Sequence, residues 1–129
     1  MTEATVLVVE DNDRNLRLVK DVLEHAGFRV VVARSGESGV DLAVERPPDL
    51  VLLDLGLPGI DGHEALRRLR ASPRTRGLPV VAVTAYAMPA DRVRALEAGF
   101  DGYLEKPLDV LSLPRDVRRF LHAKEAVRD

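Results

Sequence analysis

The sequence predicts an α/β fold in which five parallel strands alternate with five helices that cover both faces of one sheet. Apolar runs recur along the chain, and stretches with apolar residues at helical spacing separate them. The run at residues 50–53 has no polar alternation, which is typical of a strand buried on both faces of a parallel sheet. Short connections between alternating strands and helices favour the same architecture.

Each predicted element has its own sequence signals. The predicted strands cover residues 5–9, 28–33, 50–53, 79–83 and 100–105. Asn12 or Asp13 can cap the first helix, and Gly27 ends it. Its apolar positions are Leu16, Val19, Leu23 and Ala26. Ser35 is the predicted cap of the second helix, which stops before Pro47. The inner face of that helix is predicted to carry Val40, Ala43 and Val44.

The three remaining helices also have recognisable starts. Asp61 and Glu64 have capping-box spacing for a helix with Ala65, Leu66 and Leu69 inward. Pro89 suits the first turn of the next helix, which Gly99 ends. Its inward residues are predicted to be Ala90, Val93 and Leu96. Ser112 is the predicted cap of the last helix, with Pro114 in its first turn. Its inward residues are predicted to be Val117, Phe120 and Leu121.

Length and composition indicate one ordinary globular domain. The chain has 129 residues, of which 46% are hydrophobic and 31% charged. We expect the domain to cover residues 1–122, followed by a charged tail at 123–129 and no output domain. The net charge of -2 does not suggest binding to nucleic acid or to a membrane. Since there is no cysteine, thiolate metal sites are excluded and a cytoplasmic location is expected.

Polar side chains close four of the predicted strands. Glu10 and Asp11 follow the first strand, Asp54 the third, Thr84 the fourth and Lys106 the fifth. Because the carboxyl ends of parallel strands share one edge of the sheet, these residues can converge there. Taken singly, each has a plainer interpretation as a helix cap, a strand threonine or a surface lysine.

Three carboxylates at one edge need cations beside them. Each pair at ~4 Å repels by about 4 kcal/mol at an effective dielectric constant of ~20. Lys106 supplies one positive charge, and a divalent ion that prefers carboxylate oxygens and water, such as Mg²⁺, would supply the rest. Thr84 and Lys106 could then hold an anion, and the combination suits a phosphoryl group. Asp54 is the candidate nucleophile that would form an acyl phosphate.

These motifs resemble the receiver domain of two-component response regulators. The resemblance rests on Glu10-Asp11, Asp54, Leu57-Pro58 with Asp61-Gly62, Thr84-Ala85 and Lys106-Pro107, and covers nearly the whole chain. In detail the chain looks most similar to single-domain receivers of the cell-cycle and chemotaxis kind. The resemblance implies a flavodoxin-like fold with strand order 2-1-3-4-5.

The resemblance also implies roles for individual residues. Asp54 would take a phosphoryl group from a phosphohistidine on a sensor histidine kinase or a histidine phosphotransfer protein. Asp11, Asp54 and the carbonyl of Gly56 would ligate Mg²⁺ directly, and Glu10 through water. Lys106 would pair with a phosphoryl oxygen, and a cis Lys106–Pro107 bond is expected to aim it.

The resemblance further implies a conformational switch. Thr84 would hydrogen-bond a phosphoryl oxygen, and Tyr103 would turn inward when Thr84 moves. A downstream protein would bind the face formed by the helix from Pro89, the strand over 100–105 and the last helix. Gly56 and Tyr86 depart from commoner family patterns, with opposite expected effects on water access, so the lifetime of the phosphorylated state stays open.

Two other functions remain to be weighed against this switch. A Mg²⁺-dependent phosphohydrolase would share the Asp54 nucleophile, but Gly56 stands where a general acid would be expected. A nucleotide- or flavin-binding module would need a glycine-rich loop after the first strand, where acidic and amide residues stand instead. The arginine run between 67 and 76 is interpreted as a solvated helix face, and His25, His63 and His122 as surface residues.

Overall fold

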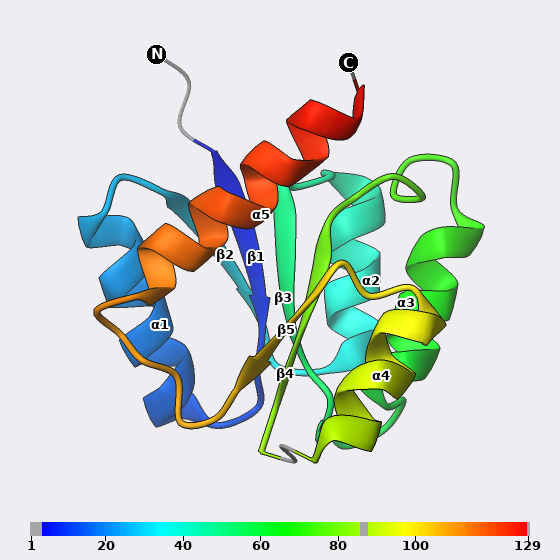
Figure 1. Cartoon of the computed structure of the whole chain (residues 1–129), viewed down its shortest axis with the longest axis horizontal. Helices are drawn as coiled ribbons and strands as arrows, with labels where there is room; N and C mark the ends of the chain where they lie inside the picture. The colour runs from blue at the N-terminus through cyan, green and yellow to red at the C-terminus, as the bar shows by residue number, and fades with distance from the viewer. Residues whose placement is uncertain (1–3, 86–87, 129) are drawn as a thin grey trace.

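Five parallel strands form one sheet in the order β2-β1-β3-β4-β5, as expected. The computed structural model describes residues 4–85 and 88–128 (Figure 1). The strands are β1 (Thr5–Val9), β2 (Arg29–Ala33), β3 (Leu50–Asp54), β4 (Val80–Thr84) and β5 (Gly102–Glu105). The helices are α1 (Asp13–His25), α2 (Gly36–Glu45), α3 (Gly62–Ala71), α4 (Pro89–Ala98) and α5 (Leu113–Arg128). The predicted α/β fold is therefore confirmed.

The sheet separates two apolar layers. Alternate residues of the central strands point to opposite faces, so that Leu7 and Val51 pack under α2, α3 and α4 while Val6 and Leu52 pack under α1 and α5. Every residue of β3 and β4 is buried. Such fully buried central strands hold the polar residues at their carboxyl ends in fixed positions.

Most predicted helix boundaries agree with the structure. Asn12, Ser35 and Asp61 cap α1, α2 and α3 through side-chain hydrogen bonds. Gly27 adopts a left-handed conformation with φ +100°, and Gly99 does so at the end of α4 with φ +111°. Residues 123–128, expected as a charged tail, continue α5. Among the described residues, no helix combines the length and the apolar character that crossing a bilayer requires.

The prediction for the inner face of α4 was wrong. Val93 is 53% exposed and Leu96 45% exposed, and Ala90 is also exposed. The buried residue of this helix is Ala95. The spacing of the apolar residues did not predict which side chains are buried, because α4 contacts the rest of the domain along a narrow strip. Its larger apolar side chains therefore lie at the surface.

The predicted solvated arginine face was also partly wrong, because Arg70 is a structural residue. Its guanidinium group donates to the carbonyls of Arg76 and Leu78 at 3.1 and 2.6 Å. It also donates to the Gly99 carbonyl at 3.1 Å and to Asp101 Oδ2 at 2.9 Å. Arg70 thereby ties the end of α3 to the end of α4 and the start of β5. By contrast, Arg67 and Arg68 form exposed pairs with Glu64 on α3 itself.

We predict that Arg70→Ala lowers the free energy of unfolding by about 1–3 kcal/mol, because several acceptors lose a charged donor at once. Arg70→Lys should recover little of the lost stability, since an ammonium group cannot reproduce the several planar N–H donors of a guanidinium group. Arg67→Ala is the matched control and should leave stability unchanged, because its pair is exposed. Urea unfolding of the three variants measures this; equal stabilities of Arg70→Ala and Arg67→Ala would contradict it.

Candidate functional site

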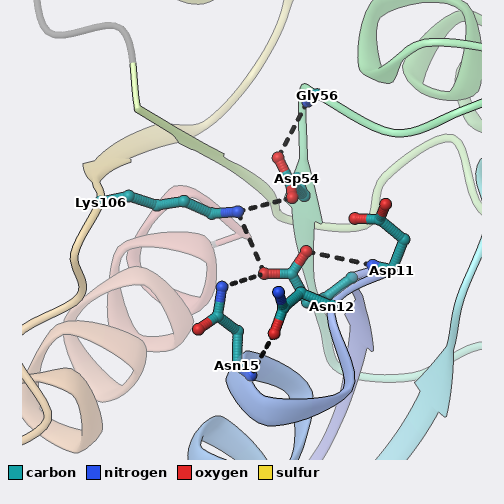
Figure 2. A network of polar contacts seen from close by, with 7 residues as sticks. Asp11, Asn12, Asn15, Asp54, Gly56 and Lys106 are labelled. Atoms are coloured by element: carbon teal, nitrogen blue, oxygen red, sulfur yellow. Dashed lines mark hydrogen bonds and ion pairs between the residues drawn. The ribbon is translucent and has the colours of Figure 1, made fainter.

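The acids that close β1 and β3 meet at one edge of the sheet. Val9 and Leu53 are register partners, so Glu10 and Asp54 extend from adjacent strands at the same level. Oxygen atoms of Glu10, Asp11 and Asp54 all lie within 4.8 Å of one another. Glu10 and Asp54 are 5% and 6% exposed, whereas Asp11 is exposed to solvent. The strand ends thus concentrate negative charge in a partly buried site (Figure 2).

Lys106 supplies the cation that this cluster requires. Its Nζ lies 2.6 Å from Asp54 Oδ2 and 3.0 Å from Glu10 Oε1. Its backbone N–H donates to the Thr84 carbonyl at 2.8 Å, which fixes the backbone of Lys106 beside the end of β4. The Lys106–Pro107 peptide bond is cis, as expected. Residues from the ends of β1, β3 and β5, 96 positions apart for Glu10 and Lys106, therefore share one ion-pair network.

The two buried carboxyl groups differ in their pKa. Burial raises the pKa of Glu10, and the neighbouring Asp54 raises it further, against the opposing effect of Lys106. Burial also acts to raise the pKa of Asp54, but hydrogen bonds with Glu10, Lys106 and the Gly56 N–H outweigh it and hold that pKa below its usual value. Asp54 is thus the carboxylate that stays ionised most readily, as a nucleophile must. The same two acids raise the pKa of Lys106 despite its partial burial.

Backbone and amide donors complete the network. The Gly56 N–H donates to Asp54 Oδ1 at 2.9 Å, and the Asp11 N–H donates to Glu10 Oε2 at 3.1 Å. Asn15 Nδ2, on the first turn of α1, lies 3.2 Å from Glu10 Oε1. Sequence reasoning missed Asn15. Asn15 lies one helical turn after the Asn12 cap, so its side chain points back toward the end of β1. This spacing was the sequence feature that could have indicated its contact with Glu10.

The other predicted site residues occupy neighbouring positions. Thr84 closes β4 at the same edge and is 3% exposed. Tyr103 is half-buried on β5, as the register partner of Ala82. Burial raises its pKa, as do the charges of Asp91 and Glu105. Tyr86 lies outside the described residues.

The cluster fits a small divalent cation. Two oxygens on opposite sides of Mg²⁺ lie about 4.2 Å apart, which matches carboxylate oxygens gathered within 4.8 Å. The hard oxygen donors and the absence of cysteine and histidine from this set favour Mg²⁺ over softer metals. Glu10, Asp11 and Asp54 are therefore the residues that would hold the ion.

Comparisons with known proteins agree on one family. The profile of the response regulator receiver domain matches residues 6–118. The polar-differentiation response regulator DivK of Brucella ovis is 38% identical over 117 residues, which cover 91% of this chain and 95% of DivK.

Solved structures similar to this chain are also receiver domains. The receiver domain of the sensor histidine kinase PA1611 from Pseudomonas aeruginosa PAO1 was solved with a magnesium ion coordinated in its active site cleft. It superimposes with a TM-score of 0.86 at 35% identity, over 94% of this chain and 99% of that one. A CheY-like receiver domain protein from Methanospirillum hungatei JF-1 gives 0.84 at 29% identity, over 97% and 98%.

We predict that Lys106→Met destabilises the metal-free protein by about 2–4 kcal/mol near neutral pH, because Glu10 and Asp54 lose their shared cation. Burial and the neighbouring Asp54 already raise the pKa of Glu10 in the folded state, and the loss of Lys106 removes the cation that opposes them. A carboxyl group with a raised folded-state pKa destabilises the protein as pH increases, so the deficit should be larger at about pH 7.5 than at about pH 5.

Urea unfolding in EDTA at the two pH values measures this deficit. Added Mg²⁺ should restore part of the stability at the higher pH, since a second cation then faces the acids. A deficit independent of both pH and Mg²⁺ would show that Lys106 does not compensate this cluster.

Proposed function

The chain belongs to the response regulator receiver domain family, and on that premise we propose that it is a response regulator that accepts a phosphoryl group on Asp54. The observation that carries the proposal is the contact of one ammonium group, Lys106 Nζ, with Asp54 Oδ2 at 2.6 Å inside a cluster fit for Mg²⁺. The donor is a phosphohistidine of a sensor histidine kinase or a histidine phosphotransfer protein.

The proposed reaction needs Asp54 as an ionised nucleophile. One Asp54 oxygen attacks the phosphorus of the phosphohistidine; a P–O bond forms while the P–N bond breaks. The imidazole nitrogen leaves with the electron pair and takes up a proton. Lys106 then turns from the Asp54 carboxylate to a phosphoryl oxygen, while the Gly56 N–H keeps the other carboxyl oxygen in place.

Magnesium is the proposed cofactor. Asp11, Asp54 and the Gly56 carbonyl would hold it directly, and Glu10 through water. When bound, Mg²⁺ neutralises charge on the phosphoryl oxygens. The magnesium in the PA1611 receiver domain supports this assignment, since that protein is 35% identical.

The proposed readout is a change in protein–protein contacts. Phosphorylation adds about -1.5 to -2 charge at the edge. Thr84 would hydrogen-bond the phosphoryl group and Tyr103 would turn inward, altering the face formed by α4, β5 and α5. The exposed Val93 and Leu96 on α4 support this face as a binding surface for a downstream protein.

In this proposal the protein is not an enzyme that turns over a separate substrate. It catalyses its own phosphoryl transfer and dephosphorylation, and it acts in the cytoplasm. A Mg²⁺-dependent phosphohydrolase would instead hydrolyse a phosphomonoester through many turnovers.

We predict that incubation with Mg²⁺ and phosphoramidate adds the mass of one phosphoryl group to the protein, because Asp54 is ionised and lies beside Lys106. Intact mass spectrometry measures the product. Asp54→Ala should not react, whereas Asp41→Asn, a change to an exposed acid on α2, should react like the wild type. Full reaction of Asp54→Ala would rule out Asp54 as the acceptor.

A separate prediction concerns the switch. Adding beryllofluoride with Mg²⁺ should shift backbone amide resonances between residues 84 and 108, since Thr84 and Tyr103 lie in that segment. Thr84→Ala should reduce the shifts around Tyr103 without preventing binding at Asp54. Amide resonances that stay fixed in this segment while those near Asp54 move would contradict the proposed switch.

A further inference from the structure

The Glu10 carboxylate is held by three donors from different parts of the chain. Its Oε1 meets Lys106 Nζ at 3.0 Å and Asn15 Nδ2 at 3.2 Å, and its Oε2 accepts from the Asp11 N–H at 3.1 Å (Figure 2). Only 7% of its side-chain surface is exposed. Since both oxygens have partners, the orientation of this carboxylate is fixed.

Among these three donors, Lys106 is the one whose contact with Glu10 we expect to change during the reaction. It lies closer to Asp54, at 2.6 Å, than to Glu10, at 3.0 Å. In the proposed reaction it turns to a phosphoryl oxygen, which weakens its contact with Glu10. A carboxylate that depended on Lys106 alone would lose its orientation at that step.

Asn15 does not depend on the state of Asp54. Its backbone N–H is fixed by the Asn12 side chain at 3.0 Å, in the first turn of α1, and its side-chain amide points back to Glu10. An amide donor is neutral, so it fixes the carboxylate without repelling a divalent cation. A lysine or arginine at this position would add a positive charge beside the metal.

We propose that Asn15 is a positioning residue for magnesium: it holds Glu10 in the orientation that receives a metal-bound water, before and after Lys106 moves. This inference rests on the proposed function, because it assumes that Mg²⁺ binds between Glu10, Asp11 and Asp54. Partners that orient metal ligands typically change metal affinity 10- to 100-fold. We expect a smaller effect, about 3- to 10-fold, because Glu10 contacts the ion through water.

The test is the Mg²⁺ affinity of the unphosphorylated protein. The chain has no tryptophan, so a MgCl₂ titration followed by backbone amide shifts is the suitable readout. Asn15→Ala and the nearly isosteric Asn15→Leu should both raise the Kd about 3- to 10-fold. Leu18→Ala, a neutral change at an exposed position of α1, is the matched control and should bind like the wild type.

A second readout separates positioning from a general structural role. In EDTA, the urea midpoint of Asn15→Ala should equal that of Leu18→Ala. In a Lys106→Met background Glu10 keeps the side-chain hydrogen bond from Asn15 but loses the one from Lys106, so Asn15→Ala should weaken Mg²⁺ binding by a larger factor than in the wild type.

The outcomes distinguish this inference from the proposed function. If the wild type binds Mg²⁺ and takes a phosphoryl group but Asn15→Ala has an unchanged Kd, the Asn15 assignment is overturned alone. The assignment is also overturned if Leu18→Ala raises the Kd for Mg²⁺ as much as Asn15→Ala does. The same holds if Asn15→Ala raises the Kd in the Lys106→Met background by a factor no larger than in the wild type. If the wild type neither binds Mg²⁺ nor takes a phosphoryl group, the proposed function itself fails.

Discussion

Repulsion between the carboxylates of Glu10, Asp11 and Asp54 is the constraint on which the site depends. Their oxygens lie within 4.8 Å, and two of the three side chains are almost fully buried. The parallel register of β1 and β3 brings these acids together, so the same sheet that gives stability also creates the repulsion. The position of β5 relieves it, because its last backbone contacts direct Lys106 over Asp54 and Glu10. The same arrangement of strands therefore brings the acids together and places Lys106 where it compensates their charge.

Helices α1 and α4 differ in how firmly they are attached to the sheet. Helix α1 buries Leu16, Val19 and Leu23, whereas α4 buries Ala95. What holds α4 at its far end is Arg70, whose guanidinium group binds the Gly99 carbonyl and Asp101. A helix pinned at one end and lightly packed elsewhere can be displaced at modest cost, and coupling energies between sites are typically 1–3 kcal/mol. This explains physically why the proposed switch would act through α4 and β5 and not through α1.

The sequence was most informative where backbone geometry decides the outcome. Caps such as Asn12 and Asp61, and the acids at the ends of β1 and β3, follow from local patterns and the shared edge of a parallel sheet. The strand order did not follow from these patterns and was predicted from the family resemblance. Val93 and Leu96 were misjudged because their burial depends on how closely α4 approaches the sheet, which spacing does not encode. Arg70 and Asn15 were missed because their partners are carbonyls and a carboxylate brought together by folding.

Charge also explains why neutral donors surround the site. Lys106 can offset the acids before reaction, but a phosphoryl group on Asp54 would add negative charge and draw the ammonium group toward itself. Carboxylates that relied on Lys106 for orientation would then lose that orientation while they hold the metal ion beside the phosphoryl group. The Gly56 N–H on Asp54 and the Asp11 N–H and Asn15 amide on Glu10 carry no net charge, so a phosphoryl group would attract them less strongly than the ammonium group. They would therefore keep the carboxylate oxygens oriented while the ammonium group of Lys106 turned to the phosphoryl group.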